Sequence, residues 1–146
     1  YAGADYVKFQ TYTVDNLTIK TTPKAIYQKK NTAAEADQYS MLQKLQISEK
    51  DHLTLIKYSK IKKIKFLSSA FDLESLKFLQ SLSLDKIKIP SGEITNIPYL
   101  KLAAKYNKET ILSTGMCTMQ EIKFALDTLV KSGLSKKKNH TFAVQH

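Results

Sequence analysis

The pattern of apolar and polar residues marks five short β-prone segments, which begin near residues 6, 65, 86, 109 and 141. In the first segment, Val7 and Phe9 fall on one face and Lys8 and Gln10 on the other, which is the period of a strand. Segments with helical spacing separate the later strands. This alternation predicts an α/β fold built from right-handed parallel β-α-β units.

Capping residues mark where the expected helices begin. The residues with this role are Ser48, Asp72, Thr95 or Asn96, and Thr118. In the helix after Ser48, we expect Leu53, Ile56 and Ile61 to form the apolar face and His52 to be solvated. A further helical pattern covers residues 38–45. The long polar segment from about 11 to 37 reads as a loop, and loops of that length are usually functional or mobile.

Two architectures share this alternation, an open doubly wound sheet and a (β/α)₈ barrel. The sequence contains neither GxGxxG nor GxxxxGK[ST], the glycine-rich loops typical of nucleotide-binding open sheets. Polar residues instead follow every strand, as in barrels whose site draws on many loops. A closed barrel needs roughly 250 residues, so a chain of this length corresponds to about five-eighths of one. We therefore expect a partial TIM barrel of five parallel strands and four helical segments.

The formal net charge of +10 raises the possibility of a basic nucleic-acid-binding module. All 23 basic residues are lysine, however, and base readout favours the bidentate guanidinium of arginine. A lysine-rich solvated surface is the simpler interpretation, and it remains compatible with an anionic small molecule. No apolar run reaches the ~20 residues of a membrane helix. The single cysteine, Cys117, fits a reducing compartment, so we expect a cytoplasmic protein.

The strand ends supply the candidate chemistry. They carry Lys8 and Gln10, Ser68 and Ser69, Lys88 with Ser91 and Glu93, Ser113 and Thr114, and Gln145 and His146. Two lysines beside several hydroxyls favour a cradle for a phosphorylated, acidic substrate, and Glu93 is suited to orient a sugar hydroxyl or to carry a proton. The alternative is that both lysines only extend their charged ends to solvent from apolar strands. The three histidines show no metal spacing, and Cys117 reads as a packing residue.

Four blocks in order along the chain resemble the sialic acid synthase family, the N-acetylneuraminate synthases. They are Gly3 to Thr11, Phe66 to Asp72, Lys88 to Asn96 and Ile111 to Met116. The last two blocks, which include Ser-Gly-Glu-Ile-Thr-Asn and Leu-Ser-Thr-Gly-Met, are the most specific. The turn in the third block fits the neuraminate or legionaminate branch better than the pseudaminate branch.

The resemblance implies a TIM barrel that condenses phosphoenolpyruvate with an N-acetylated mannose-type sugar. The sugar would be N-acetylmannosamine or a 2,4-diacetamido-6-deoxy analogue, and the products a nine-carbon ulosonic acid and phosphate. A related phosphoenolpyruvate-dependent synthase of other keto-sugar acids is the alternative enzyme. The family also implies a divalent metal, Mn²⁺ or Mg²⁺, which polarises the sugar aldehyde. A cytoplasmic homodimer without nucleic-acid or membrane partners is expected.

Residue by residue, the resemblance implies two groups of contacts. Lys8, Lys88, Ser69, Ser91 and Ser113 match positions that hold phosphoenolpyruvate. Gln10, Phe71 and Glu93 match the remaining substrate-binding positions, with Glu93 and Lys88 expected to be catalytic. The second block departs from the family's Ser-Thr-Pro-Phe, because it reads Ser68-Ser69-Ala70-Phe71.

The resemblance also sets expectations for the domain organisation. Residues 1–146 match part of the family's N-terminal catalytic barrel. The family's first strand, its later strands with the metal-binding histidines, and its C-terminal antifreeze-like domain have no counterpart in this sequence. We therefore expect a substrate cradle whose metal ligands lie outside the chain, and a fragment that is inactive alone.

Overall fold

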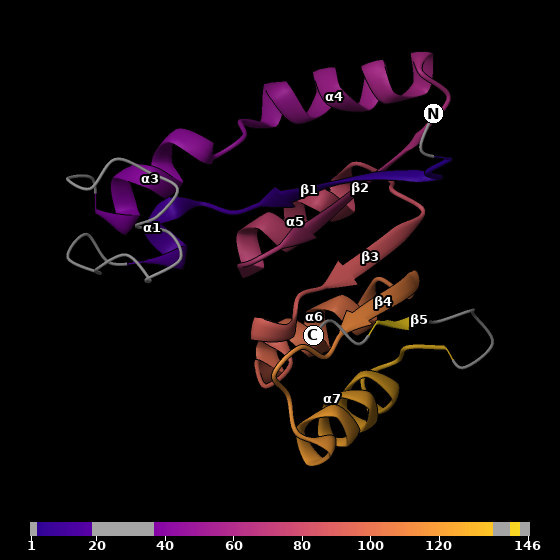
Figure 1. Cartoon of the computed structure of the whole chain (residues 1–146). Helices are drawn as coiled ribbons and strands as arrows, with labels where there is room; N and C mark the ends of the chain where they lie inside the picture. The colour runs from indigo at the N-terminus through magenta and orange to yellow at the C-terminus, as the bar shows by residue number, and fades with distance from the viewer. Residues whose placement is uncertain (1–2, 19–36, 136–140, 144–146) are drawn as a thin grey trace.

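The computed structural model describes residues 3–18, 37–135 and 141–143. Its centre is a parallel sheet of five strands in the order β1-β2-β3-β4-β5 (Figure 1). The strands are β1 (Tyr6–Thr11), β2 (Lys65–Ala70), β3 (Lys86–Ile89), β4 (Glu109–Ser113) and β5 (Thr141–Ala143). Each strand pairs with the next one in sequence. A doubly wound sheet reverses its strand order at a switch point, whereas a barrel does not, so the order favours the barrel.

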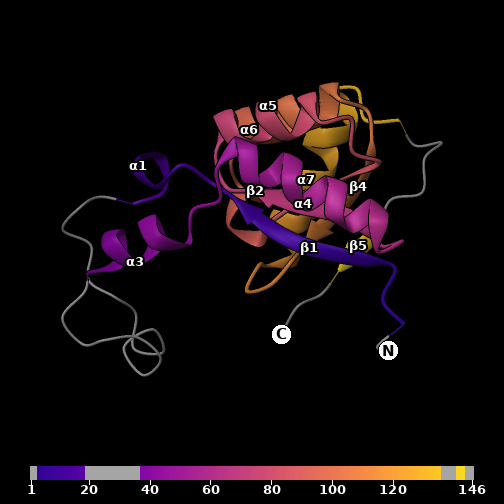
Figure 2. The same cartoon turned by 90° about the horizontal axis from the view of Figure 1, so that it is seen from above.

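Helices connect the strands and pack on one side of the sheet, as α5 and α6 show in Figure 2. The connecting helices are α4 (Glu49–Ile61), α5 (Leu73–Ser81), α6 (Ile97–Lys105) and α7 (Met119–Lys131), and the 3₁₀ turn η1 (Ser91–Glu93) follows β3. Leu76, Leu100 and Leu129 from three of these helices meet Ile89 and Leu112 of the sheet in the hydrophobic core. Burial of these apolar side chains is the main force that holds the helices on the sheet.

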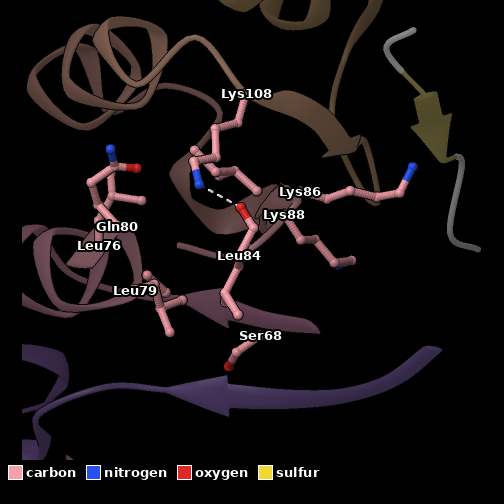
Figure 3. A pocket seen from close by; sticks show the side chains of 10 residues that line it. Ser68, Leu76, Leu79, Gln80, Leu84, Lys86, Lys88 and Lys108 are labelled. Carbon is pink, nitrogen blue, oxygen red and sulfur yellow. Dashed lines mark hydrogen bonds between the residues drawn. The ribbon is translucent and has the colours of Figure 1, made fainter. Parts of the chain in front are cut away.

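The two faces of the sheet differ in chemistry. In β3, Ile87 and Ile89 are buried against the helices, while Lys86 and Lys88 extend to the opposite side (Figure 3). We call this opposite side the inner face. By the alternation of the strands and their register, its members are Tyr6, Lys8, Gln10, Lys65, Leu67, Ser69, Lys86, Lys88, Glu109, Ile111 and Ser113. The expected separation of Val7 and Phe9 from Lys8 and Gln10 is confirmed, because Phe9 stacks on Phe66 of the helix side.

The predicted helix starts are also confirmed. Ser48, Asp72, Asn96 and Thr118 each accept a hydrogen bond from a backbone N–H of the first turn. Thr118 and Glu121 form the reciprocal capping box. Because each cap follows a strand end or its loop, these local signals place the helix N-termini at the carboxyl edge of the sheet.

The apolar face predicted for α4 is wrong. Leu53 is 49% exposed and Ile61 is 74% exposed, whereas His52 is completely buried, so its predicted solvation is wrong as well. The imidazole lies edge-on against Phe66 and Phe78, whose rings make the apolar site that buries it. The helix is thus rotated so that His52 and Ser59 face the sheet.

The polar segment after β1 contains more structure than its composition indicates. Helix α1 (Val14–Leu17) lies within it and buries Val14, and α3 (Gln38–Leu45) follows the segment as predicted. Some expectations fall outside the described residues, namely those for residues 19–36, Gln145 and His146.

Candidate functional site

The strand register brings inner-face side chains from four strands into one row. Gln10 pairs with Ser69, Ser69 with Lys88, and Lys88 with Ile111. This row lies near the carboxyl ends of the strands, which is where sites form in parallel α/β folds. Five of the candidate residues, Lys8, Gln10, Ser69, Lys88 and Ser113, therefore share one face and one edge of the sheet.

Lys88 is the central cation of this row. Its side chain is half-buried, and its Nζ donates a hydrogen bond of 2.7 Å to Oγ of the buried Ser113. Burial lowers the pKa of the Lys88 ammonium, and the positive charge of Lys8 lowers it further. The two lysines are thus close enough to repel each other. An anion bound between them would relieve both the desolvation and the repulsion.

Ser69 stands beside Lys88 with an unusual hydroxyl. The residue is 1% exposed, and within the described part of the chain its Oγ has no hydrogen-bond partner. Buried hydroxyls are nearly always hydrogen-bonded, so each exception calls for an explanation. A ligand oxygen held by the neighbouring lysines would supply the missing partner.

The turn after β3 carries the candidate acid–base group. The half-buried Glu93 carboxylate accepts a 2.6 Å hydrogen bond at Oε2 from Nδ2 of Asn96. Burial raises the pKa of Glu93 and the charge of Asp72 raises it further, while the Asn96 hydrogen bond acts in the opposite direction. A carboxyl group that keeps its proton to higher pH than usual is suited to general acid–base chemistry.

The remaining candidates, Ser91 and Phe71, lie just beyond the ends of their strands. Ser91 opens the same turn, and its carbonyl accepts the Ile94 N–H. Phe71 comes immediately after β2, half-buried, with its N–H donated to the Thr11 carbonyl. The structure thus puts both residues at the carboxyl edge of the sheet, next to the row.

Two supporting residues lie beside the site, namely Asp72, which the sequence pattern marked only as a helix cap, and Tyr99, to which it assigned no role. Asp72 accepts hydrogen bonds from the N–H groups of Thr13 and Ser75, so it joins the β1 loop to α5. Tyr99 is fully buried and donates its hydroxyl to the Ala70 carbonyl at 2.9 Å. The i, i+3 spacing of Glu93 and Asn96 was a signal that their side chains could meet in a turn.

His52 forms a buried polar chain behind the same strand ends. Its Nδ1 lies 2.8 Å from the Ser48 carbonyl, which can only accept, so Nδ1 carries a proton. Its Nε2 lies 2.8 Å from Oγ1 of Thr11, which in turn lies 2.7 Å from Oγ of Ser68. The chain ties α4, β1 and β2 together on the helix side. It holds Gln10 and Ser69, the neighbours of Thr11 and Ser68, in their positions on the inner face.

The described residues include neither a cluster suited to a metal ion nor a cysteine whose thiol pKa is lowered. Residues 3–18, 37–135 and 141–143 contain no cluster of three or more His, Cys, Asp or Glu side chains suited to a metal ion. Cys117 is half-buried beside the Ser91 carbonyl, and burial together with Glu121 raises the pKa of its thiol. A raised thiol pKa fits the packing role expected of it. Among the same residues, no helix has the length and apolar character to cross a membrane.

Comparisons with known proteins agree with this geometry. The sequence matches the NeuB family over residues 1–146. It is 50% identical over 140 residues to the N,N'-diacetyllegionaminic acid synthase of Campylobacter jejuni, covering 96% of this chain and 42% of that protein. It is 48% identical over 128 residues to the N,N'-diacetyllegionaminic acid synthase of Legionella pneumophila, covering 88% of this chain and 36% of that protein.

A solved structure shows the same fold. The N-acetylneuraminic acid (sialic acid) synthetase of Leptospira borgpetersenii, in complex with citrate, superposes with a TM-score of 0.72 at 25% identity. The match covers 97% of this chain and 42% of that one. The structural relatives are TIM-barrel synthases, which confirms the expected partial barrel. The chain spans less than half the length of these relatives.

Proposed function

Because the chain belongs to the NeuB family, which comprises the sialic acid synthases with their legionaminate branch, we propose that the whole protein is a phosphoenolpyruvate-dependent ulosonic acid synthase. It condenses phosphoenolpyruvate with an N-acetylated mannose-type sugar and releases phosphate. The observation that carries this proposal is the pair of inner-face lysines, of which Lys88 is desolvated and repelled by Lys8. A doubly anionic substrate is the natural counterpart of such a pair.

In this proposal, Lys8 and Lys88 hold the phosphate and carboxylate of phosphoenolpyruvate. A half-buried ammonium makes stronger charge-assisted hydrogen bonds than one in bulk water, because the local dielectric is lower. Ser69, Ser91 and Ser113 complete the cradle with hydroxyl groups. Support comes from the buried Oγ of Ser69 and from the Lys88–Ser113 hydrogen bond, which directs the Lys88 ammonium toward the carboxyl end of β4.

Gln10, Phe71 and Glu93 face the sugar in this scheme. The enol carbon of phosphoenolpyruvate attacks the aldehyde carbon, and the aldehyde oxygen becomes a hydroxyl by accepting a proton. Glu93 is proposed to give that proton, since burial and Asp72 raise the pKa of its carboxyl group. Water then adds to the cationic carbon left on the phosphoenolpyruvate unit and loses a proton to the Glu93 carboxylate. The tetrahedral intermediate expels phosphate by cleavage of the C–O bond.

The divalent metal stays a prediction from the family resemblance. Bound Mn²⁺ or Mg²⁺ would polarise the aldehyde, and its ligands are proposed to lie outside this chain. Because the described residues hold no cluster that fits a metal, no step above is assigned to it.

For the acceptor, we propose a 2,4-diacetamido-6-deoxy mannose-type sugar ahead of N-acetylmannosamine. The support is the high identity to two proteins named as N,N'-diacetyllegionaminic acid synthases. Acceptor choice is a difference in transition-state binding of two sugars, so both must be compared in one assay.

The test is phosphate release by the full-length protein with phosphoenolpyruvate, Mn²⁺ and each sugar in turn. We expect release with at least one sugar and a higher kcat/KM with the diacetamido sugar. Absence of phosphate with either sugar would overturn the synthase proposal. A preference for N-acetylmannosamine would overturn only the choice of acceptor.

A further inference from the structure

Asn96 makes two side-chain hydrogen bonds that belong to different parts of the molecule. Its Oδ1 accepts the Tyr99 N–H at 3.2 Å and so caps α6. Its Nδ2 donates to Oε2 of Glu93 at 2.6 Å. The two backbones are also joined, because the Asn96 N–H donates to the Glu93 carbonyl at 3.0 Å. The helix cap and the candidate acid–base group therefore share one side chain.

The cap determines which way the Asn96 amide points. A backbone N–H can only donate, so the atom that faces Tyr99 must be the amide oxygen. The amide nitrogen is then left to face Glu93, and it can only donate. Tyr99 itself is fixed, since it is fully buried and its hydroxyl is bonded to the Ala70 carbonyl. The Asn96 amide, which is fixed by its bond to α6, thus restrains the Glu93 carboxylate.

We propose that Asn96 is a positioning residue for Glu93, holding Oε2 of the carboxylate so that Oε1 is directed to the substrate. This inference rests on the proposed condensation and assigns a role within it. In the described part of the chain, Oε1 has no hydrogen-bond partner, whereas Oε2 is held at 2.6 Å. A carboxylate held at one oxygen has the other in a defined place for proton transfer.

The groups around Glu93 determine how strongly the Asn96–Glu93 hydrogen bond affects the charge of the carboxylate. Asp72, from the turn between β2 and α5, brings a second negative charge, and the Tyr99 side chain on α6 also interacts with Glu93 electrostatically. Both Asp72 and burial favour the neutral carboxyl, and Asn96 is the group that opposes them. Removing its donor should therefore change both the orientation and the protonation of Glu93.

Two substitutions separate the cap from the donor. Asn96→Ser and Asn96→Asp both keep an oxygen that can cap α6, because Ser and Asp are good N-cap residues. Asn96→Asp has no side-chain donor when ionised and places a carboxylate beside Glu93, while Asn96→Ser replaces the Nδ2 donor with a hydroxyl on a shorter side chain. Thr118→Ser is the matched control, since it exchanges the cap of α7, a helix whose cap does not contact Glu93.

In the full-length protein with phosphoenolpyruvate, Mn²⁺ and the preferred sugar, we expect kcat to fall about tenfold or more in both Asn96 variants. KM for phosphoenolpyruvate should stay near the wild-type value, because Lys8, Lys88 and Ser113 are untouched. The limb of the pH profile set by Glu93 should move to higher pH, further in Asn96→Asp than in Asn96→Ser. Thr118→Ser should leave all three quantities unchanged.

A second readout does not need turnover. The side-chain amide signal of Asn96, followed by NMR across the pH range, should shift as Glu93 titrates and lose this shift in Glu93→Gln. Asn96 variants that retain the wild-type melting temperature, kcat and pH profile would overturn the proposal, as would an amide signal that ignores Glu93. If the wild-type protein releases no phosphate, the proposed function fails, while the amide titration still reports whether the Asn96–Glu93 contact exists.

Discussion

Ser68 and Ser69 are neighbours in β2 and are equally buried, yet they lie in opposite surroundings. On the helix side, Ser68 joins Thr11 and His52 in a chain of hydrogen bonds in which each buried polar atom has a partner. On the inner face, Ser69 is 1% exposed and its hydroxyl has no partner in the described residues. Buried polar groups with all their hydrogen bonds made stabilise a fold. A buried hydroxyl without a hydrogen-bond partner, beside two lysines, indicates a place for a ligand.

The same contrast runs along β3. Ile87 and Ile89 complete the hydrophobic core, while Lys86 and Lys88 occupy the inner face. The two lysines also differ, because Lys86 pairs with Glu109 and Lys88 has only the neutral Ser113 as its hydrogen-bond partner among the described residues. Charge on the inner face is thus balanced at the amino ends of the strands and left unbalanced at the carboxyl ends.

The largest effect is expected from Lys88→Met in the full-length protein. It removes a desolvated cation, so the free energy of unfolding should stay level or rise. Affinity for phosphoenolpyruvate should fall roughly 10- to 100-fold, which corresponds to the loss of one charge-assisted hydrogen bond. Turnover should fall with it. Calorimetric titration with phosphoenolpyruvate and urea unfolding measure the two effects.

Lys86→Met is the matched control on the same strand and face. It leaves the half-buried Glu109 carboxylate without its partner, so it should lower stability and leave phosphoenolpyruvate affinity nearly unchanged. If both lysine variants bind phosphoenolpyruvate as the wild type does, the inner face is not the anion cradle.

Smaller effects on stability and on phosphoenolpyruvate affinity are expected from alanine variants of Ser68 and Ser69. Ser68→Ala breaks a buried 2.7 Å hydrogen bond to Thr11 and should cost about 1–3 kcal/mol of stability, with little change in substrate affinity. Ser69→Ala removes a hydroxyl that has no partner in the described residues, so stability should not fall. Its phosphoenolpyruvate affinity should drop roughly three- to tenfold, as for one neutral hydrogen bond.

Urea unfolding and calorimetric titration of both variants test whether Ser68→Ala lowers only stability and Ser69→Ala lowers only phosphoenolpyruvate affinity. Equal losses of stability in the two would show that Ser69 is bonded within the protein. Unchanged affinity in Ser69→Ala would remove it from the cradle.

The sequence predicts what depends on neighbouring residues. The alternation Lys86-Ile87-Lys88-Ile89 was sufficient to assign the two faces of β3, and Asp72 and Thr118 were recognisable as caps, because strand period and capping are local properties. Repetition of the strand–helix unit then put the polar strand ends at one edge. The roles of those residues toward substrate remain predictions.

What the sequence could not supply depends on distant elements. His52 is buried by Phe66 and Phe78 and bonded to Thr11, three residues from other strands and helices, while helical spacing alone favoured Leu53 and Ile61. The desolvation of Lys88 and the influence of Asp72 on Glu93 are likewise tertiary effects. Contacts of this kind override local hydrophobic pattern, which is why the face of α4 was predicted wrongly.

The smallest effect concerns the stability of Glu93→Gln as a function of pH. The folded-state pKa of Glu93 is raised above the ordinary value of 4.5, so the native state disfavours the charged form. The contribution of Glu93 to stability is therefore fully present below pH 4.5 and is lost as pH rises through the folded-state pKa. Gln keeps an oxygen to accept from Asn96 but carries no charge.

Glu93→Gln should accordingly melt above the wild type at pH 7, by no more than a few degrees, and close to it at pH 4. Thermal unfolding at the two pH values measures the difference, and Glu74→Gln, at an exposed position of α5, serves as a control that should show no such gain. A gain of equal size at both pH values would mean that packing is responsible. Absence of any gain at pH 7 would mean that the carboxylate is stabilised in the native state, and Glu93 would then not be the proton donor that the condensation requires.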